Sequence, residues 1–472
     1  MSRIIRNYLA PVYLALCLLL GGASAAGFLA NGALQMLGIL CILLVVLTGA
    51  LPILERDSRN LLLLFAAAGA LLLLELLPLP PFLWSLLPGR DWVAEGYAAM
   101  GSDLPWLPIS LAPDGTLMAL ASLIVPLAMT LLIFASTGYG RFYCVFVLFA
   151  VAVLSIFLGV LQRMQGPDSL YYIYEITNRG GVVGFFANRN HLATLLLMTL
   201  PFVGALAVDP KRSSRSTEHD DSRVGRLMIT GCLALLLAVG VVIVSSAAGW
   251  FLLVPAIFGA AAVFVRSEKG KVPRALVQTG LVVAAVCVIA AIVAPLQVSD
   301  LGDKLSGINP QHRNMSIRTT AGAALDYLPF GSGAQSFQLI YPHYEDAANA
   351  SLEYMNHAHN DYVEVFLEHG IPGLVLIGAA LVFWIRQAGR QWRQGKGDPL
   401  SRASFLAIGI VVAHSLVDYP SRTAAIAVML AFSAALMVAP ASDEVPAWQG
   451  RNKRRSRGKK SPRRIEIALA DQ

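Results

Sequence analysis

Long apolar segments alternate with shorter polar ones along most of this chain of 472 residues. A helix needs about 20 apolar residues to cross a hydrocarbon core of roughly 30 Å. On that rule the pattern predicts twelve transmembrane helices, at residues 8–29, 33–54, 61–84, 116–136, 142–162, 191–208, 227–244, 248–265, 275–296, 371–388, 403–417 and 422–439. The expected fold is an all-α, polytopic integral membrane protein, whose first segment stays as a helix rather than being removed as a signal peptide.

Three polar segments are too long to be simple connections between these helices: residues 85–115, 163–190 and, above all, 297–370. All three fall on the same side of the predicted bundle. Because functional groups concentrate in loops that a rigid scaffold holds, we expect the functional site on this side.

Two short helices and a turn are predicted inside the longest polar segment. Apolar residues recur at helical spacing over 316–328, and the glycine-rich run 329–333 predicts a turn. A second helix is predicted over 361–370. Asp361 would cap it, with Glu364 three residues later as in a capping box, and Gly370 with the following proline would end it.

Composition and charge agree with a membrane protein. Hydrophobic residues make up 56% of the chain and charged residues only 14%, against roughly 45–50% and about 25% in soluble domains. The basic loops (55–60, 136–141, 209–226, 266–274 and 386–402) and the basic tail 441–472 all fall on one side, so the positive-inside rule places both termini in the cytoplasm. The three long polar segments would then be periplasmic.

Neither the tail nor the cysteines predict a chemical role. We interpret the basic tail as a topology anchor beside anionic lipid headgroups rather than a nucleic-acid site. The five cysteines lie in or beside apolar runs, so they form neither a disulfide framework nor a zinc ribbon.

The run HAHNDYVE, residues 357–364, is the strongest candidate for chemistry. His359 precedes a predicted helix N-terminus, whose positive dipole end favours the neutral imidazole, and a neutral imidazole can act as a base. The spacing alone leaves two alternatives open. His359 could be an interfacial residue that only makes hydrogen bonds, or His357 and His359 could bind a metal with Asp361, although no HExxH motif supports this.

Three ionisable residues, His414, Asp418 and Arg422, would lie near the outer ends of the last two spans. Such residues are costly in a membrane and indicate function by default. They could pair with each other or line the site, and the ion pair is the favoured interpretation. Glu75, in the third span, is expected to face the bundle.

Four stretches together resemble the bacterial O-antigen ligase and O-antigen polymerase superfamily: GFFANRNHLATLLLMTLP (184–201), IRTTAGAALDYLPFGSGAQSF (317–337), HAHNDYVEVFLEHGIPGL (357–374) and AHSLVDYPSR (413–422). The likeness covers most of residues 180–440. It divides the chain into N-terminal helices (1–180), a ligase- or polymerase-like core (181–440) that includes the 297–370 loop, and the tail (441–472).

The resemblance implies a metal-independent, inverting glycosyltransferase without a cofactor. It would move a glycan from undecaprenyl pyrophosphate to an acceptor hydroxyl at the outer face of the bacterial inner membrane, in lipopolysaccharide or exopolysaccharide synthesis. The acceptor would be another lipid-linked glycan or lipid A core, with a chain-length regulator as a further partner. The chain has no DxD pair and no Walker loop, in agreement with a donor that is not a nucleotide sugar.

The resemblance also assigns roles to single residues. His359 matches the base that activates the acceptor hydroxyl, while Arg189 and Arg318 match arginines that bind the pyrophosphate. Spacing alone favours an interface anchor as the role of Arg189, and the resemblance reverses this preference. Relatives often carry a bulky aromatic residue shortly after the loop arginine, where this chain has Ala321 and Gly322, so Arg313 is the reserve assignment.

Asn360, Tyr362, Glu364, His414, Asp418 and Arg422 are candidate supporting residues of this site. A transporter or flippase of lipid-linked oligosaccharide is the competing class, but the sequence shows no internal repeat of the kind that transporters carry. Between the two enzyme types, the HAHNDY and HSLVDYP runs slightly favour a polymerase over a ligase.

Overall fold

The computed structural model describes residues 2–24, 28–175, 177–208, 220–267, 310–346, 355–393 and 398–439. Most of these residues lie in helices, and the β-sheet among them is a single antiparallel pair of two-residue strands. The elements are α1 (Arg3–Leu20), α2 (Phe28–Leu47), α3 (Arg56–Glu75), β1 (Pro78–Leu79), α4 (Pro81–Trp84), α5 (Asp91–Ala99), β2 (Leu107–Pro108), α6 (Pro113–Ser122), α7 (Ile124–Ala135), α8 (Gly138–Gln165), α9 (Arg189–Leu206), α10 (Asp220–Val244), α11 (Ala247–Ser267), α14 (Pro310–Asp326), α15 (Phe337–Tyr344), α16 (Asp361–Ala388), η2 (Gly389–Arg393), α17 (Pro399–His414), η3 (Pro420–Arg422) and α18 (Ala424–Val438).

The predicted membrane class is confirmed. An apolar helix stands at every predicted span except 275–296, which lies outside the described residues, as does the tail 441–472. Within the described part of the chain, eight helices are long and apolar enough to cross a membrane. The protein is therefore an all-α polytopic membrane protein, while the total of twelve spans stays a prediction.

Three predicted span ends are wrong, one of them in the second helix, which ends at Leu47 instead of residue 54. The first helix ends at Leu20 instead of residue 29: Gly21 is its C-cap, and Gly22 approaches Phe185 so closely that a Cβ would lie 1.9 Å from its carbonyl oxygen. The third helix ends at Glu75 instead of residue 84. Three prolines follow closely from Pro78 onward, and proline has no N–H to continue a helix.

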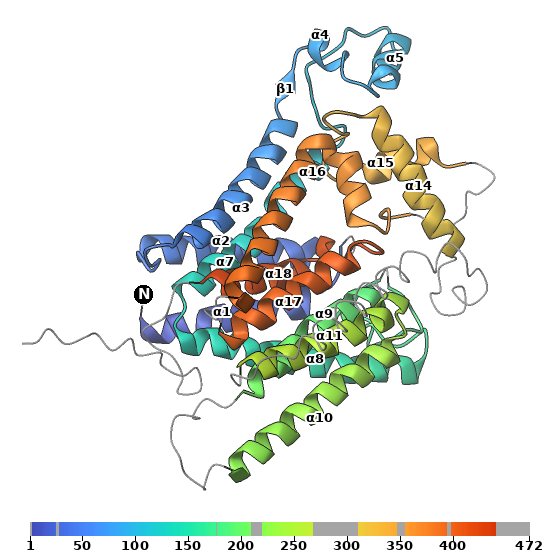
Figure 1. Ribbon diagram of the computed structural model, residues 1–472. Helices are drawn as coiled ribbons and strands as arrows, with labels where there is room; N and C mark the ends of the chain where they lie inside the picture. The colour runs from blue at the N-terminus through green and yellow to red at the C-terminus, as the bar shows by residue number, and fades with distance from the viewer. Residues whose placement is uncertain are drawn as a thin grey trace, which may run out of the picture.

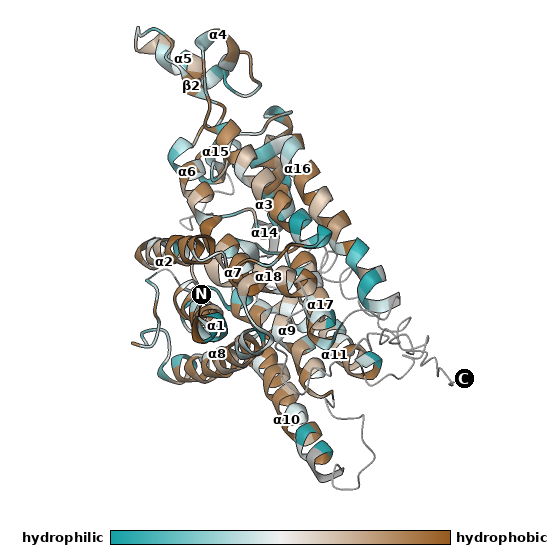
Figure 2. Ribbon diagram, turned by 90° about the vertical axis from the view of Figure 1, so that its left-hand side faces the viewer, coloured by the Kyte–Doolittle hydropathy of each residue, from teal (hydrophilic) through white to brown (hydrophobic). Residues whose placement is uncertain are grey.

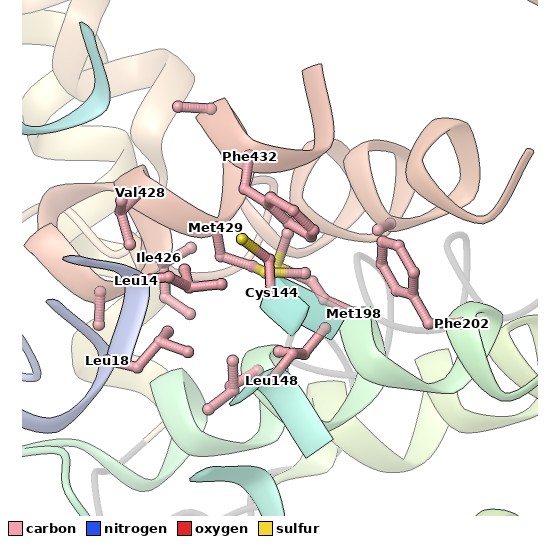
Figure 3. Packing of buried hydrophobic residues seen from close by; sticks show 14 of the residues in the cluster. Leu14, Leu18, Cys144, Leu148, Met198, Phe202, Ile426, Val428, Met429 and Phe432 are labelled. Atoms are coloured by element: carbon pink, nitrogen blue, oxygen red, sulfur yellow. The ribbon is translucent and has the colours of Figure 1, made fainter. Parts of the chain in front are cut away.

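The centre of the bundle is α9, in which every residue from His191 to Ala205 is buried. It packs against α8, α10, α11 and α17, and α18 packs against α7 and α17. Figure 3 shows side chains of α1, α8, α9 and α18 meeting in this core, where the rings of Phe202 and Phe432 stack with centroids 5.9 Å apart. Apolar packing therefore fixes where the N-terminus of α9 lies.

Large apolar side chains are also exposed on the outside of the bundle, whose helices consist mostly of hydrophobic residues (Figure 2). Met36, Leu73 and Phe157 are each more than half exposed. A continuous apolar surface of this kind is unfavourable in water and favourable against lipid. This surface agrees with a membrane-embedded protein.

A smaller apolar cluster packs α14, α15 and the first part of α16 together. We call the end of the bundle where these helices lie the polar end, because the long polar segments of the sequence meet there (Figure 1). The helix predicted at 316–328 is confirmed as part of α14, and the turn at 329–333 is confirmed, with positive φ at Gly331 and Gly333. The helix at 361–370 is confirmed as the start of α16. Gly370 (φ 54°) interrupts it, but a second helical part follows at once and continues to Ala388.

Buried Arg90 joins two of the long polar segments. Its Nη2 donates to the carbonyl oxygens of Ile109 (2.6 Å) and Gly331 (3.1 Å), and its guanidinium lies 5.4 Å from the ring centroid of Tyr327. Burial lowers the pKa of the Arg90 guanidinium to about 10, which leaves it charged at neutral pH. Segment 85–115 and the described residues of segment 297–370 (310–346 and 355–370) are therefore in direct contact at the polar end.

The contact between α9 and α11 leads to a first prediction. A Cβ on Gly204 would lie 2.0 Å from the carbonyl oxygen of Ala260, which is backbone and cannot move aside alone. Gly204→Val should therefore lower the stability by about 1–3 kcal/mol or more, measured as the thermal unfolding midpoint of the purified protein in detergent. The control is Gly231→Ala in α10, where the space is open and the stability should hold or rise slightly. An unchanged midpoint for Gly204→Val would contradict this packing.

Candidate active site

His359 lies two residues before α16 and is almost completely buried, with 5% of its surface exposed. Its backbone φ is +53°, a left-handed conformation that is uncommon for a residue with a side chain and costs energy unless the surroundings impose it. The next residue is held firmly by hydrogen bonds of its side chain. Asn360 is the N-cap of α16: its Oδ1 accepts from the N–H groups of Tyr362 (3.0 Å) and Val363 (3.1 Å), and its Nδ2 donates to Leu416 O (2.8 Å).

The predicted cap was therefore wrong by one residue. Asn360 caps the helix, and Asp361 instead accepts hydrogen bonds from Ser415 and Ser421, each at 2.7 Å. Glu364 also does not complete a capping box. Its Oε2 accepts from the N–H of Ala358 (2.9 Å), two residues before the cap Asn360 whose N–H such a box would use, so it holds the chain that leads to His359.

Asp418 is the partner of His359. The Nδ1 atom of His359 lies 3.2 Å from Oδ1 of Asp418, and Oδ2 of the same carboxylate accepts from Nδ2 of Asn190, in the first turn of α9. The Asp418 side chain is 1% exposed. Since an ionised carboxylate only accepts hydrogen bonds, this contact assigns the imidazole proton to Nδ1 and leaves the lone pair on Nε2.

The ring of Tyr419 lies among three imidazoles. Its centroid is 4.2 Å from that of His357, 5.1 Å from that of His359 and 5.2 Å from that of His191. The sequence analysis assigned no role to Tyr419, Asn190 or His191. The available signals were the polar run NRNH at the start of an apolar span and the tyrosine directly after Asp418.

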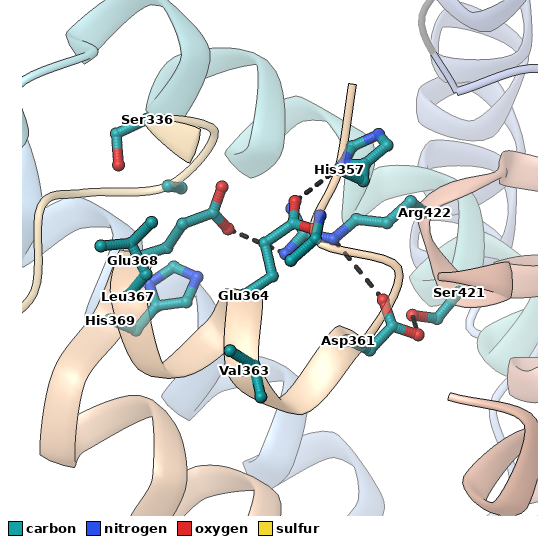
Figure 4. A network of polar contacts seen from close by, with 12 residues as sticks. Ser336, His357, Asp361, Val363, Glu364, Leu367, Glu368, His369, Ser421 and Arg422 are labelled. Carbon is teal, nitrogen blue, oxygen red and sulfur yellow. Dashed lines mark hydrogen bonds and ion pairs between the residues drawn. The ribbon is translucent and has the colours of Figure 1, made fainter. Parts of the chain in front are cut away.

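A second network surrounds Arg422 (Figure 4). Asp361, Glu364 and Glu368 lie on one face of α16, and Arg422 reaches all three: Nη2 is 2.9 Å from Glu368, Nη1 is 3.4 Å from Glu364 and Nε is 3.7 Å from Asp361. His357 adds a contact of 2.7 Å from Nδ1 to Glu364. Three buried carboxylates thus face one guanidinium and one imidazole.

This geometry corrects the ion-pair interpretation of His414, Asp418 and Arg422. Arg422 does form buried ion pairs, but with the acids of α16, and Asp418 contacts His359 and Asn190. His414 lies deeper in the bundle, with Nδ1 2.8 Å from the hydroxyl oxygen of Thr194. Each of the three therefore connects different helices.

Tyr362 and Glu75 also connect elements at this end. The hydroxyl of Tyr362 donates to Val412 O (2.7 Å) and so attaches α16 to α17. Glu75, expected to face the bundle, is buried at the end of α3, where it accepts from Ala334 N (3.1 Å) and lies 2.5 Å from Nδ1 of His369.

The two predicted pyrophosphate ligands lie in different settings. Arg189 begins α9 beside Asn190, its N–H donates to Asn178 (3.2 Å), and it is half-buried. Arg318 is exposed on α14, on the face opposite buried Ser316 and Thr320. The side chain of the reserve residue Arg313 lies outside the described residues. Arg189 and Arg318 stay predictions.

A cavity of about 520 Å³ lies beside this site. Its walls are mainly apolar side chains of α3, α16, α17 and α18. The polar part of its lining includes Asp361, His369, Ser421 and Arg422. Such walls fit a hydrocarbon chain better than a sugar. As for metal ligands, no group of three or more His, Cys, Asp or Glu side chains able to hold an ion occurs within the described residues.

Comparison with known families identifies one family that this chain resembles. Residues 232–378 match the family model described as O-antigen ligase, a range that includes His359 and the three acids of α16. A search of curated proteins finds no match to the chain. The family match confirms the resemblance to the O-antigen ligase and O-antigen polymerase superfamily.

The class that fold and family define is a membrane-embedded, glycosyl-transferring enzyme of the ligase or polymerase type, with a role in membrane glycan assembly. Two of the four resembling stretches, 317–337 and 357–374, lie inside the matched range. The other two, 184–201 and 413–422, lie outside it, yet they supply Asn190 and Asp418 to the surroundings of His359.

The Arg422 network leads to a second prediction. Arg422→Gln would leave three buried carboxylates without their guanidinium, which typically costs about 3–5 kcal/mol when one partner of a buried pair is removed. We expect a clear fall in the thermal unfolding midpoint. The matched control is Arg390→Gln, because Arg390 also pairs with two carboxylates, Glu55 and Asp57, but is partly exposed and should contribute less than about 1 kcal/mol. Equal effects of both variants would show that the network is not buried.

Proposed function

We propose that this protein is an inverting, metal-independent glycosyltransferase that moves a glycan from undecaprenyl pyrophosphate to an acceptor hydroxyl. The observation that carries the proposal is the buried contact between His359 and Asp418, which leaves Nε2 of the imidazole as a base. A sugar hydroxyl is a weak nucleophile until a positioned base removes its proton. The two residues supply this base and its orientation.

The reaction is a single displacement. Nε2 of His359 takes the proton of the acceptor hydroxyl while its oxygen forms a bond to the anomeric carbon of the donor. The bond from that carbon to the pyrophosphate oxygen breaks, and undecaprenyl pyrophosphate leaves with the electron pair. Because attack and departure occur on opposite faces, the configuration inverts. The carboxylate of Asp418 stabilises the imidazolium that forms.

Binding of the donor needs positive charge and an apolar surface. Arg189 and Arg318 are the proposed pyrophosphate ligands, since guanidinium groups contact phosphate oxygens in a bidentate way. Arg422 is a poorer ligand because three carboxylates already surround it. The apolar walls of the cavity between α3 and α16 support a substrate that carries a lipid chain.

The proposed setting is the bacterial inner membrane, with both termini in the cytoplasm and the polar end in the periplasm. It rests on the basic loops, which fall on the opposite side from the long polar segments. The acceptor is a lipid-linked glycan in a polymerase or lipid A core in a ligase. The sequence motifs favour the polymerase slightly, for which a chain-length regulator is an expected partner.

The direct test is His359→Ala in a deletion strain, with surface glycans and lipid-linked intermediates compared at equal membrane levels of protein. Removal of a general base should lower transfer by about 100-fold or more. Single repeats left on lipid would identify a polymerase, and finished long chains left on lipid a ligase. His343→Ala is the control, because His343 is an exposed histidine of the same long segment. Normal glycan from His359→Ala would contradict the mechanism and favour a transporter.

The role of Asp418 is tested separately. Asp418→Asn keeps the shape of the side chain but removes the charge that fixes the imidazole proton on Nδ1 and stabilises the imidazolium. We expect kcat of the purified enzyme to fall by roughly tenfold or more, with KM for both substrates nearly unchanged. A rise in KM alone, with normal kcat, would instead mean that Asp418 serves substrate binding.

A further inference from the structure

His191 is a buried imidazole without a hydrogen bond. It is 2% exposed, and neither Nδ1 nor Nε2 has a hydrogen-bond partner among the described residues. The other polar side chains in the buried part of α9 are satisfied within the helix: Thr194 donates to Asn190 O (2.9 Å) and Thr199 to Leu195 O (2.7 Å). Buried polar groups are nearly always paired, so an imidazole with two unpaired nitrogens requires an explanation.

The position of His191 supplies that explanation. It follows Asn190, the residue that binds the carboxylate of Asp418, and its ring packs edge-on against Tyr419 with centroids 5.2 Å apart. The same tyrosine ring contacts His359. His191 is also within electrostatic range of Asp418, His357 and His359. It therefore belongs to the cluster around the proposed base and not to the apolar core of α9.

Simple packing does not account for an imidazole at this position. An aromatic or aliphatic side chain would fill the space beside Tyr419 without leaving two polar atoms unpaired, and the residues that follow in α9 are mostly of that kind. A neutral imidazole offers one N–H donor and one acceptor nitrogen. A sugar hydroxyl, which both donates and accepts, satisfies either of them.

We propose that His191 is a substrate-contacting residue, whose ring nitrogen forms a hydrogen bond with a glycan hydroxyl next to the reacting centre. This inference rests on the proposed function, since it takes the glycan as substrate. His191 and His359 are both almost fully buried and share Tyr419 as a neighbour. This shared neighbour is the reason to expect that a sugar whose hydroxyl reaches His359 also lies near His191.

The test uses the purified full-length protein. The donor is undecaprenyl pyrophosphate-linked glycan, extracted from a strain that lacks this protein. Initial transfer rates are measured against the concentration of this donor and of each acceptor, lipid A core or the same lipid-linked glycan. The variants are His191→Phe, which keeps an aromatic ring without polar atoms, and His191→Gln, which keeps a hydrogen-bonding group. Thr199→Val is the matched control, a buried polar residue deeper in α9.

We expect His191→Phe to raise KM for one substrate by about tenfold, the loss of one ordinary hydrogen bond. Its unfolding midpoint without substrate should be unchanged or higher, because a buried unpaired group has gone. His191→Gln should recover part of the affinity, and Thr199→Val should leave KM unchanged. The substrate whose KM changes identifies the sugar that His191 contacts. Kinetics of His191→Phe within about twofold of wild type would overturn the proposal, as would a loss of activity that only follows a lower unfolding midpoint.

A second readout separates this inference from the proposed function. In the His359→Ala background, the same lipid-linked glycan should raise the unfolding midpoint, and adding His191→Phe should reduce that shift. If the glycan stabilises both proteins equally, His191 does not bind it, whatever the transfer assay shows. If wild type transfers glycan to neither acceptor but His191→Phe still weakens the shift, the proposed reaction fails while the contact holds.

Discussion

The polar end of this protein depends on one buried carboxylate. Asp418 is withdrawn from water between α17 and η3, and a carboxylate in that position is stable only if hydrogen bonds replace its hydration. It finds them on two segments far away in the sequence, at Asn190 on α9 and at His359 before α16. The hydrogen bonds of this one charge therefore link three of the four stretches that resemble the superfamily.

The Arg422 network also stabilises buried charges by pairing them, but its structural role is different. Asp361, Glu364 and Glu368 share one face of α16 because they follow one another at helical spacing, and their repulsion is relieved by a guanidinium from η3. A surplus of carboxylate around Arg422 makes it a poor ligand for pyrophosphate. Arg422 instead attaches the first part of α16 to the connection between α17 and α18. This contact also holds the segment just before α16, which carries His359. His359, with its unusual backbone conformation, lies between these two networks.

The apolar bundle provides the frame for both networks. Burial of α9 along its whole length fixes where its first turn emerges, and that turn carries Arg189, Asn190 and His191. The family match covers only the middle of this arrangement, from α10 to α16. The remaining wall of the site comes from α9 and from the connection between α17 and α18. An enzyme that acts on lipid-linked glycans needs such a junction, where an apolar bundle meets groups able to move a proton.

The sequence alone determined the membrane class, the positions of the apolar helices, the short helices at 316–328 and 361–370, and His359 as the leading candidate for chemistry. These features follow from local patterns, namely runs of apolar residues, helical spacing and a family motif. The cap at Asn360 instead of Asp361, the early end of α1 and the partners of Arg422 were decided by the tertiary structure. So was the place of His191 beside Tyr419. The reason is physical: a buried charge takes the partner that lies closest in space, and Asn190 and Asp418 are 228 residues apart in the chain.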